Sequence, residues 1–345
     1  MAREPKTLQE AIEYFANENN VNQYLIIRRW ADGIVRCPRC GSEDVLFQAK
    51  YNRYQCGKKH DLRQFTLKTG TIFEDSPVPL KKWLLAMWMV VNCKNGVSSY
   101  EIHRAIGVTQ KTAWFMDHRI RFALHQQAPT DKMGGEGSAV EADETYIGGL
   151  ARNMHKDKRK AKFNGRTGGA GKIAVFGLLE RNAKKGKSRV RVQVIPDSWK
   201  DTVNETIKAT VEPGTNVYTD EHGAYFHLGT QGFQHAFVRH AEYYVDGAVH
   251  TNGIENFWAL LKRGIKGTYV SVEPFHMFRY LDEQAFRFNE RFWNDGERFD
   301  RAVRGVLAKR LTYKVLTGKD SESLPEATNQ KRSLSGAPEE SVRNR

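Results

Sequence analysis

Three acidic residues, Asp143, Asp220 and Glu255, have the types and settings of ligands for divalent cations. Asp143 lies in VEADETYIGG, where apolar residues alternate with acids as on a half-buried strand. Asp220 ends the β-rich run NVYTD, and 34 residues separate it from Glu255, near the start of a helix in HTNGIENFWALLKRG. Lys262 follows Glu255 by about two helical turns, so we expect both on one helix face. Carboxylates that converge from two strands and a helix could hold a pair of Mg²⁺ ions.

Each acid also has an ordinary structural explanation. An Asp at the end of a strand is often a turn or cap residue. Asn252 and Glu255 fit a capping box, in which Glu255 would satisfy only a backbone amide at the helix start. The joint placement of the three acids with the lysine favours the catalytic interpretation.

Four residues have the types and spacing of a zinc site. Cys37 and Cys40 form a Cys-x2-Cys knuckle, and Cys56 with His60 forms a Cys-x3-His pair. Because protein side chains would fill all four positions, this pattern predicts structural rather than catalytic zinc. The alternative is three buried free thiols. Cys93 lies in an apolar helix, where we expect a core residue.

Residues 96–124 read as two helices separated by a turn at Gly107. Ser98 and Glu101 make a capping box for the first helix, and Thr109 caps the second. This spacing suits a helix-turn-helix that binds DNA, although two such helices can also be purely structural. Three residues lie near the start of the second, recognition helix: Gln110, Lys111 and Trp114.

Composition points to a nucleic-acid partner. The 345 residues allow two or three domains, and the net charge of +14 implies a polyanionic partner. No stretch reaches the ~18 apolar residues of a membrane span, and the longest apolar run, at 83–93, predicts a buried helix. Four unevenly placed cysteines do not suggest a disulfide framework, so a reducing cytosol is expected.

Six stretches carry a likeness to a known family: CPRC, FTLKTGTIF, VEADETYIGG, VYTDEHGAY, HTNGIENFWALLKRGIKGTY and HMFRYLDEQAFRFNER. Through them the chain resembles, over residues 20–295, bacterial insertion-sequence transposases of the DDE class with an N-terminal zinc ribbon, the ISXO2-like group. The resemblance implies an α/β fold: an RNase H-like core, with a mixed sheet and flanking helices, preceded by the ribbon and the helix-turn-helix. The family usually has a second Cys-x2-Cys knuckle, so His60 is the expected substitute for a cysteine.

Composition and resemblance divide the chain into six segments. They are an N-terminal helical segment at 1–30, with one helix over 7–30, a zinc ribbon at 31–75, a helix-turn-helix region at 80–127, a catalytic core at 136–295, a C-terminal helical segment at 296–317 and a disordered tail at 318–345. Within the core we expect strands at 172–180 and 189–197 and a helix near 198–210. A basic, Gly-rich insertion at 151–172 should form a mobile loop that grips DNA over the active site; a merely solvated loop is the alternative.

The resemblance also implies a reaction. Two Mg²⁺ or Mn²⁺ ions about 3.5–4 Å apart would activate water and then a 3′-hydroxyl for in-line attack on phosphodiesters. Asp143 would bridge both ions, Asp220 and Glu255 would each hold one, and Lys262 would contact a phosphate. Some related transposases have Asn as third ligand, which makes Asn252 an alternative to Glu255. We favour Glu255, because a carboxylate binds Mg²⁺ better and its spacing to Lys262 fits.

The expected partner is double-stranded DNA, both the terminal inverted repeats of the element and the target. Joining two ends implies a homodimer or a larger assembly on DNA. One alternative is a non-catalytic regulator, or an inactive transposase-derived protein, that binds DNA through the ribbon and the helix-turn-helix alone. Another is a nuclease that cleaves without strand transfer, and it would use the same metal site.

Overall fold

The computed structural model describes residues 3–125, 131–148, 172–184, 187–221, 223–238 and 249–319. Most of the basic insertion expected at 151–172, and the tail beyond residue 319, lie outside these ranges. Within them, no helix combines the length and the apolar character that crossing a membrane would need.

The N-terminal segment contains two helices instead of the single helix expected at 7–30. They are α1 (Leu8–Ala16) and α2 (Glu18–Arg29). Between them Asn17 is extended, with φ −86° and ψ 118°, and its side chain accepts a hydrogen bond from the Asn19 backbone amide at 2.9 Å. The single-helix prediction was wrong because an Asn side chain competes for a backbone amide and thereby caps a new helix.

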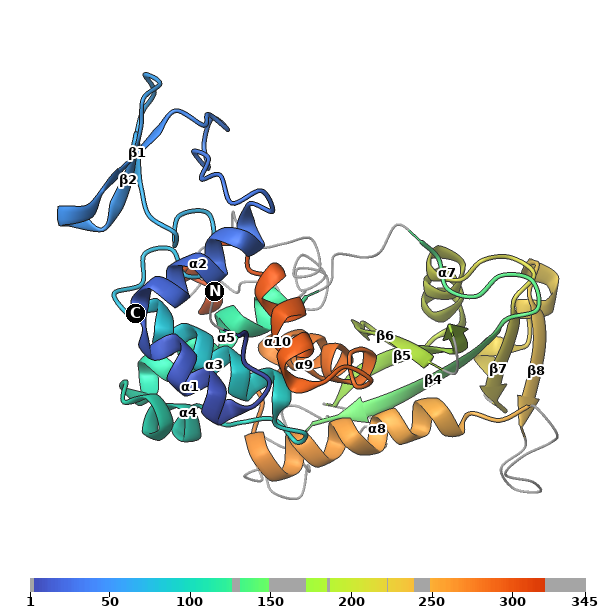
Figure 1. The fold of residues 1–345 in the computed structure, drawn as a ribbon. Coiled ribbons are helices and arrows are strands. Elements are labelled where there is room, and N and C mark those ends of the chain that lie inside the picture. The colour runs from blue at the N-terminus through green and yellow to red at the C-terminus, as the bar shows by residue number, and fades with distance from the viewer. Residues whose placement is uncertain are drawn as a thin grey trace, which may run out of the picture.

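A small antiparallel sheet follows, with strands β1 (Val45–Gln48), β2 (Arg53–Cys56) and β3 (Gln64–Phe65). In Figure 1 β1 and β2 project away from the helices. Phe65 packs with only two other buried residues, Cys37 and Cys56. A sheet of this size with so small a core needs an additional source of stability.

The helical body contains α3 (Leu80–Asn92), α4 (Ser99–Ile106) and α5 (Gln110–Leu124). The capping box of Ser98 and Glu101 is confirmed, and Thr109 accepts from the Thr112 amide at the start of α5. Gly107 ends α4 with φ +63°, in the left-handed region that glycine adopts readily. The two-helix arrangement predicted for residues 96–124 is therefore present.

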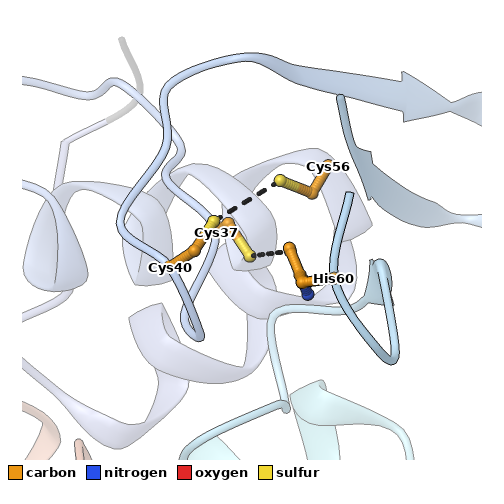
Figure 2. Close-up of side chains that lie close together, drawn as sticks. All are labelled: Cys37, Cys40, Cys56 and His60. Carbon is orange, nitrogen blue, oxygen red and sulfur yellow. Dashed lines mark hydrogen bonds between the residues drawn. The ribbon is translucent and has the colours of Figure 1, made fainter. Parts of the chain in front are cut away.

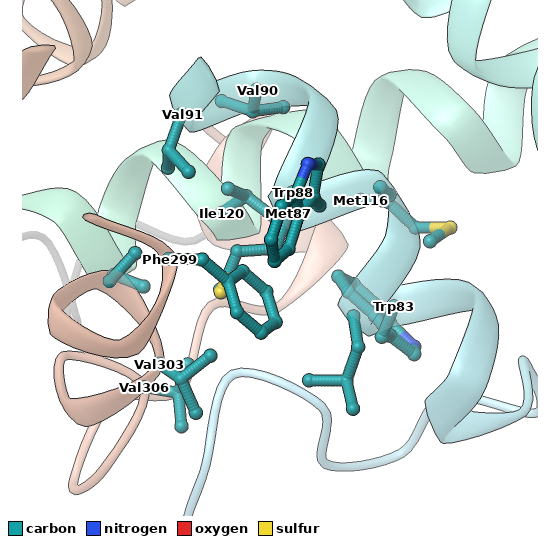
Figure 3. Packing of buried hydrophobic residues seen from close by; sticks show 14 of the residues in the cluster. Trp83, Met87, Trp88, Val90, Val91, Met116, Ile120, Phe299, Val303 and Val306 are labelled. Carbon is teal, nitrogen blue, oxygen red and sulfur yellow. The ribbon is translucent and has the colours of Figure 1, made fainter. Parts of the chain in front are cut away.

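Helices from the far end of the chain complete the core of this body. Helix α9 (Met277–Asn289) packs on α5, and α10 (Asp295–Arg304) packs on α3. The ring of Phe299 lies 5.0 Å from that of Trp88 and 5.8 Å from that of Phe15, measured between centroids. Figure 3 shows Phe299, Val303 and Val306 in the same buried cluster as Trp83 and Trp88 of α3. A short helix, α11 (Tyr313–Leu316), ends the described chain.

A five-stranded mixed sheet forms the second body of the molecule, in the order β6-β5-β4-β7-β8. Its strands are β4 (Ala139–Ile147), β5 (Ile173–Lys184), β6 (Lys187–Ile195), β7 (Asn216–Asp220) and β8 (Gln234–Val238). Strands β4, β5 and β6 are antiparallel neighbours, whereas β7 runs parallel to β4 and β8 parallel to β7. The expected succession of three strands, a helix and a strand is present, and β8 is an addition to it.

Helices cover both faces of this sheet. Alternate residues of β4 point to opposite faces: Val140 and Ala142 join the cluster of α7 (Lys200–Thr210), and Ile147 joins that of α8 (Asn252–Gly264). Figure 1 shows α8 running along the sheet. Asp143, an odd-numbered residue like Ile147, therefore faces α8.

A buried ion network joins the helical body to the segment after α8. Arg121 is fully buried and pairs with Asp117 at 2.8 Å and with Glu283 of α9 at 2.6 Å. Arg287 also pairs with Glu283, which accepts a hydrogen bond from the hydroxyl of Tyr269. Tyr269 ends the π-helical turn Ile265–Tyr269, which continues α8. Because each buried charge has an opposite partner, the network holds these elements in one arrangement.

Candidate active site and metal centre

The residues predicted to bind zinc lie together. One ligand atom from each of Cys37, Cys40, Cys56 and His60 lies within 4.8 Å of the others. The sulfurs of Cys40 and Cys56 are 3.6 Å apart, and Cys37 Sγ lies 3.5 Å from His60 Nε2 (Figure 2). A tetrahedral zinc ion with Zn–S bonds of about 2.3 Å separates two sulfurs by about 3.8 Å. The spacing therefore fits a closed four-ligand metal site.

Local backbone structure sets this geometry. Gly41, with φ +74°, donates its amide to the Cys37 carbonyl at 2.9 Å and closes the first knuckle. His60 is oriented through Nδ1, which lies 2.7 Å from the Asp61 carbonyl. Although burial opposes the change, backbone amides lower the pKa of Cys37 to about 7. A lowered pKa favours the thiolate, the form that binds a metal.

Cys93 does not lie in the core, contrary to expectation. It is the exposed residue that ends α3, because the helix terminates at Asn92 and the chain turns there. It takes no part in the Cys/His group, the one set of three or more potential ligands that meets within 4.8 Å in the part of the chain that the structure describes.

Two of the three predicted catalytic acids are neighbours. Strand β4 pairs with β7 so that Val140 lies opposite Val217, and the same register continued by three residues brings Asp143 beside Asp220. Burial, together with the negative charges of Asp220 and Glu144, raises the pKa of Asp143 to about 7. Acids this close repel one another when ionised, and a divalent cation between them would relieve the repulsion. The donor set therefore fits Mg²⁺ or Mn²⁺.

The third acid lies on α8, beside the sheet. The capping box expected of Asn252 and Glu255 is not formed, because Asn252 is the first helical residue and Thr251 is the N-cap. Glu255 is exposed, and its Oε1 accepts a hydrogen bond from the Thr251 hydroxyl at 2.7 Å. It is not within 4.8 Å of two other acids in the described ranges. Lys262 is half-buried two turns further along the helix.

The apolar stripe predicted for α8 is confirmed: Ile254, Phe257, Trp258 and Leu261 are buried against the sheet. Trp258 also makes a polar contact with the sheet: its indole Nε1 donates a hydrogen bond to Asp143 Oδ2 at 2.9 Å.

Sequence reasoning missed two further acids of β4. Glu141 is buried, with Oε1 2.6 Å from Arg181 Nε. Glu144 lies on the opposite face and accepts from the Tyr225 hydroxyl at 2.5 Å. Burial is the main cause that raises the pKa of Glu144 to about 7. Strand periodicity in VEADETY could have placed Glu141 on the face of Asp143 and Glu144 on the other.

The three residues predicted to read DNA have different settings. The Gln110 amide donates to Ser99 Oγ at 3.0 Å, and the Trp114 ring packs 4.5 Å from that of His118. Lys111 is exposed, with Nζ 5.3 Å from the ring centroid of Tyr313. Lys111 can therefore reach a phosphate, while the other two side chains contribute to local packing.

The sequence is similar to a known protein family and to a curated protein. Residues 133–289, from shortly before β4 to the end of α9, match the ISXO2-like transposase domain. A protein of Halobacterium salinarum, described as an uncharacterized protein in transposable element ISH50, is 29% identical over 262 residues, which cover 73% of this chain and 84% of that protein. These two matches support an insertion-sequence transposase, with residues 133–289 similar to its ISXO2-like transposase domain.

Proposed function

We propose that this protein cuts DNA at the ends of its element and joins them to a target, using divalent cations held by Asp143, Asp220 and Glu255. The observation that carries the proposal is the parallel register of β4 and β7, which when continued past Glu141 and Tyr218 sets Asp143 beside Asp220, within the region that matches the transposase domain. The negative charge of Asp220 also contributes to the raised pKa of Asp143. Asp143 Oδ2 is also tied to that helix through Trp258.

The strand arrangement supports an RNase H-like core. Three antiparallel strands continue into two parallel ones in the order β6-β5-β4-β7-β8, and the first strand along the chain is central. Asp143 lies in the middle of β4 and Asp220 ends β7, so the parallel register, rather than a shared strand end, brings the two carboxylates together. Helix α8 then brings Glu255 from the covering layer.

The residues have distinct roles in the proposed reaction. Bound at this site, two Mg²⁺ or Mn²⁺ ions would activate the attacking oxygen and stabilise the leaving oxygen of a phosphodiester. Asp143, Asp220 and Glu255 would supply the carboxylate oxygens that hold these ions. Asn252 is the alternative to Glu255. The positively charged ammonium group of Lys262 binds a phosphate of the reacting strand.

The N-terminal half supplies DNA binding. Cys37, Cys40, Cys56 and His60 would hold a Zn²⁺ ion that stabilises the small sheet. Lys111 would contact the backbone of the transposon end. Because two ends must be joined, a homodimer or larger assembly acts on DNA.

Strand cleavage and transfer on a duplex carrying the DNA that flanks the gene tests the proposal. The wild-type protein should nick the ends and join them to a second duplex only when Mg²⁺ or Mn²⁺ is present. Asp220→Asn should abolish both steps. Asp201→Asn, which changes an exposed acid of α7, is the matched control and should retain both.

Two outcomes contradict the proposal. Specific binding without cleavage, unchanged by Asp220→Asn, would indicate a DNA-binding regulator or an inactive transposase-derived protein. Cleavage without any joined product would indicate a nuclease that uses the same metal site.

A further inference from the structure

The indole of Trp258 holds one oxygen of the Asp143 carboxylate. Nε1 of Trp258 donates to Asp143 Oδ2 at 2.9 Å, and the backbone amide of Glu144 donates to Asp143 Oδ1 at 2.8 Å. Each carboxylate oxygen thus accepts one N–H and keeps lone-pair capacity for a cation. Two donors on the two oxygens fix the plane of the carboxylate.

A glycine on the neighbouring strand makes the space for that indole. Gly177 of β5 lies directly opposite Asp143 in the antiparallel register. A Cβ at residue 177 would lie 2.6 Å from two carbon atoms of the Trp258 ring and 2.9 Å from Ile254 Cδ1. Gly177 does not have a positive φ. Glycine is therefore needed here for the close approach of α8, not for an unusual backbone conformation.

A second contact fixes α8 one turn earlier. Glu141 is 1% exposed, and its Oε2 accepts from the Ile254 amide in the first turn of α8 at 2.8 Å. A Cβ at Gly253 would lie 2.9 Å from the same oxygen, so glycine again allows the approach. A carboxylate at a helix N-terminus is favourable because the free amides carry partial positive charge.

The two contacts bracket Glu255. Strand β4 is joined to α8 through Glu141 and Ile254 and again through Asp143 and Trp258, and Glu255 lies between these two helix positions. The helix cannot rotate or slide without breaking one of them. The same contacts that orient Asp143 therefore also set the position of Glu255 relative to the sheet.

We propose that Trp258 is a positioning residue of the metal site, which orients the Asp143 carboxylate through its indole N–H in the space left by Gly177. This inference rests on the proposed function, because it takes Asp143 as a metal ligand. Groups that hydrogen-bond a metal ligand typically contribute roughly 10–100-fold to metal affinity or activity.

The test compares Trp258→Phe with Phe257→Leu in the full-length protein. Trp258→Phe keeps an aromatic ring over Gly177 and removes the N–H. Phe257→Leu alters the adjacent, equally buried core residue of the same helix. Three quantities are measured: Mn²⁺ affinity by calorimetry without DNA, the Mg²⁺ concentration that gives half-maximal DNA cleavage, and the melting temperature.

We expect Trp258→Phe to weaken Mn²⁺ binding by roughly 10–100-fold and to raise the half-maximal Mg²⁺ concentration by a similar factor. Phe257→Leu should bind Mn²⁺ like the wild type, even if it lowers the melting temperature as much as Trp258→Phe does. Gly177→Ala should reproduce the metal defect. If Gly177 acts only by making space for the indole, the double variant Gly177→Ala/Trp258→Phe should bind Mn²⁺ no more weakly than Trp258→Phe alone.

Wild-type metal affinity in Trp258→Phe would overturn the inference, and so would an equal loss in Phe257→Leu, which would show a purely structural effect. The variant Asp143→Asn distinguishes a failure of the inference about Trp258 from a failure of the proposed metal-dependent function. If Asp143→Asn abolishes Mn²⁺ binding and cleavage while Trp258→Phe does not weaken them, only the role of Trp258 is wrong. If the wild type shows no Mn²⁺ binding that Asp143→Asn removes, both proposals fall.

Discussion

Removing the charge of Asp143 should stabilise the metal-free protein at alkaline pH. Burial beside Asp220 and Glu144 raises the pKa of this carboxyl from 3.8 to about 7. Because the folded-state pKa lies above the unfolded value, ionisation disfavours the folded state. The free energy of unfolding therefore falls as pH rises from about 4 to about 7 and is constant above.

The size of the effect follows from the shift. A change from 3.8 to about 7, at 1.36 kcal/mol per pKa unit, corresponds to about 4 kcal/mol. This is an upper limit, because the side chain is partly accessible to solvent and Glu144 shares the repulsion. We expect Asp143→Asn to raise the free energy of unfolding by about 1–4 kcal/mol at about pH 8, and to change it little at about pH 4.

Urea unfolding of both proteins in the presence of a metal chelator, at about pH 4 and about pH 8, measures this difference in the free energy of unfolding. Glu205→Gln, an exposed carboxylate of α7, is the control and should change stability by less than about 0.5 kcal/mol. Millimolar Mn²⁺ should then stabilise the wild type and not Asp143→Asn. The reasoning is refuted if Asp143→Asn is no more stable than the wild type at alkaline pH, or if its gain is the same at both pH values.

Three further predictions concern the remainder of the chain. Cys56→Ser should release bound zinc, measured by elemental analysis, and lower the melting temperature, whereas the exposed Cys93→Ser should retain the metal; equal zinc in both variants would exclude the Cys/His site. Glu283→Gln should lower the free energy of unfolding by about 3–5 kcal/mol, because it leaves Arg121 and Arg287 without their shared partner, and the exposed Glu273→Gln should not. Gly96→Ala should cost more than about 2 kcal/mol, because φ is +85° and its Cβ would lie 2.0 Å from the Tyr269 hydroxyl. Gly33→Ala, with φ +74° and no atom within 4 Å, should cost only about 1 kcal/mol in chemical denaturation; equal losses would contradict the role given to Tyr269.

Local patterns in the sequence predicted the parts of this structure that depend on local interactions. The stripe of α8, the caps of α4 and α5 and the knuckle at Cys37 follow from residues a few positions apart. The break at Asn17 was missed because an Asn inside an apolar repeat can either face solvent or cap a new helix.

Contacts between distant residues could not be predicted in this way. Trp258 reads as one more member of an apolar stripe, and only the fold brings its N–H to Asp143, 115 positions earlier. The need for Gly177 appears only when β5 and α8 are placed against each other. Arg121 and Glu283 are 162 positions apart, and nothing in either local sequence identifies the other as its partner.

The packing of α10 against the N-terminal helices constrains how the chain folds as it is made. Phe299 joins the core of Phe15, Tyr24 and Trp88. At about 5–20 residues per second, a ribosome needs roughly 10–35 s to travel from the end of α5 to Phe299. During that interval Trp83 and Trp88 lack part of the apolar surface that buries them. The nascent N-terminal half should therefore be a substrate for chaperones that bind exposed apolar segments, until the last helices emerge and close its core.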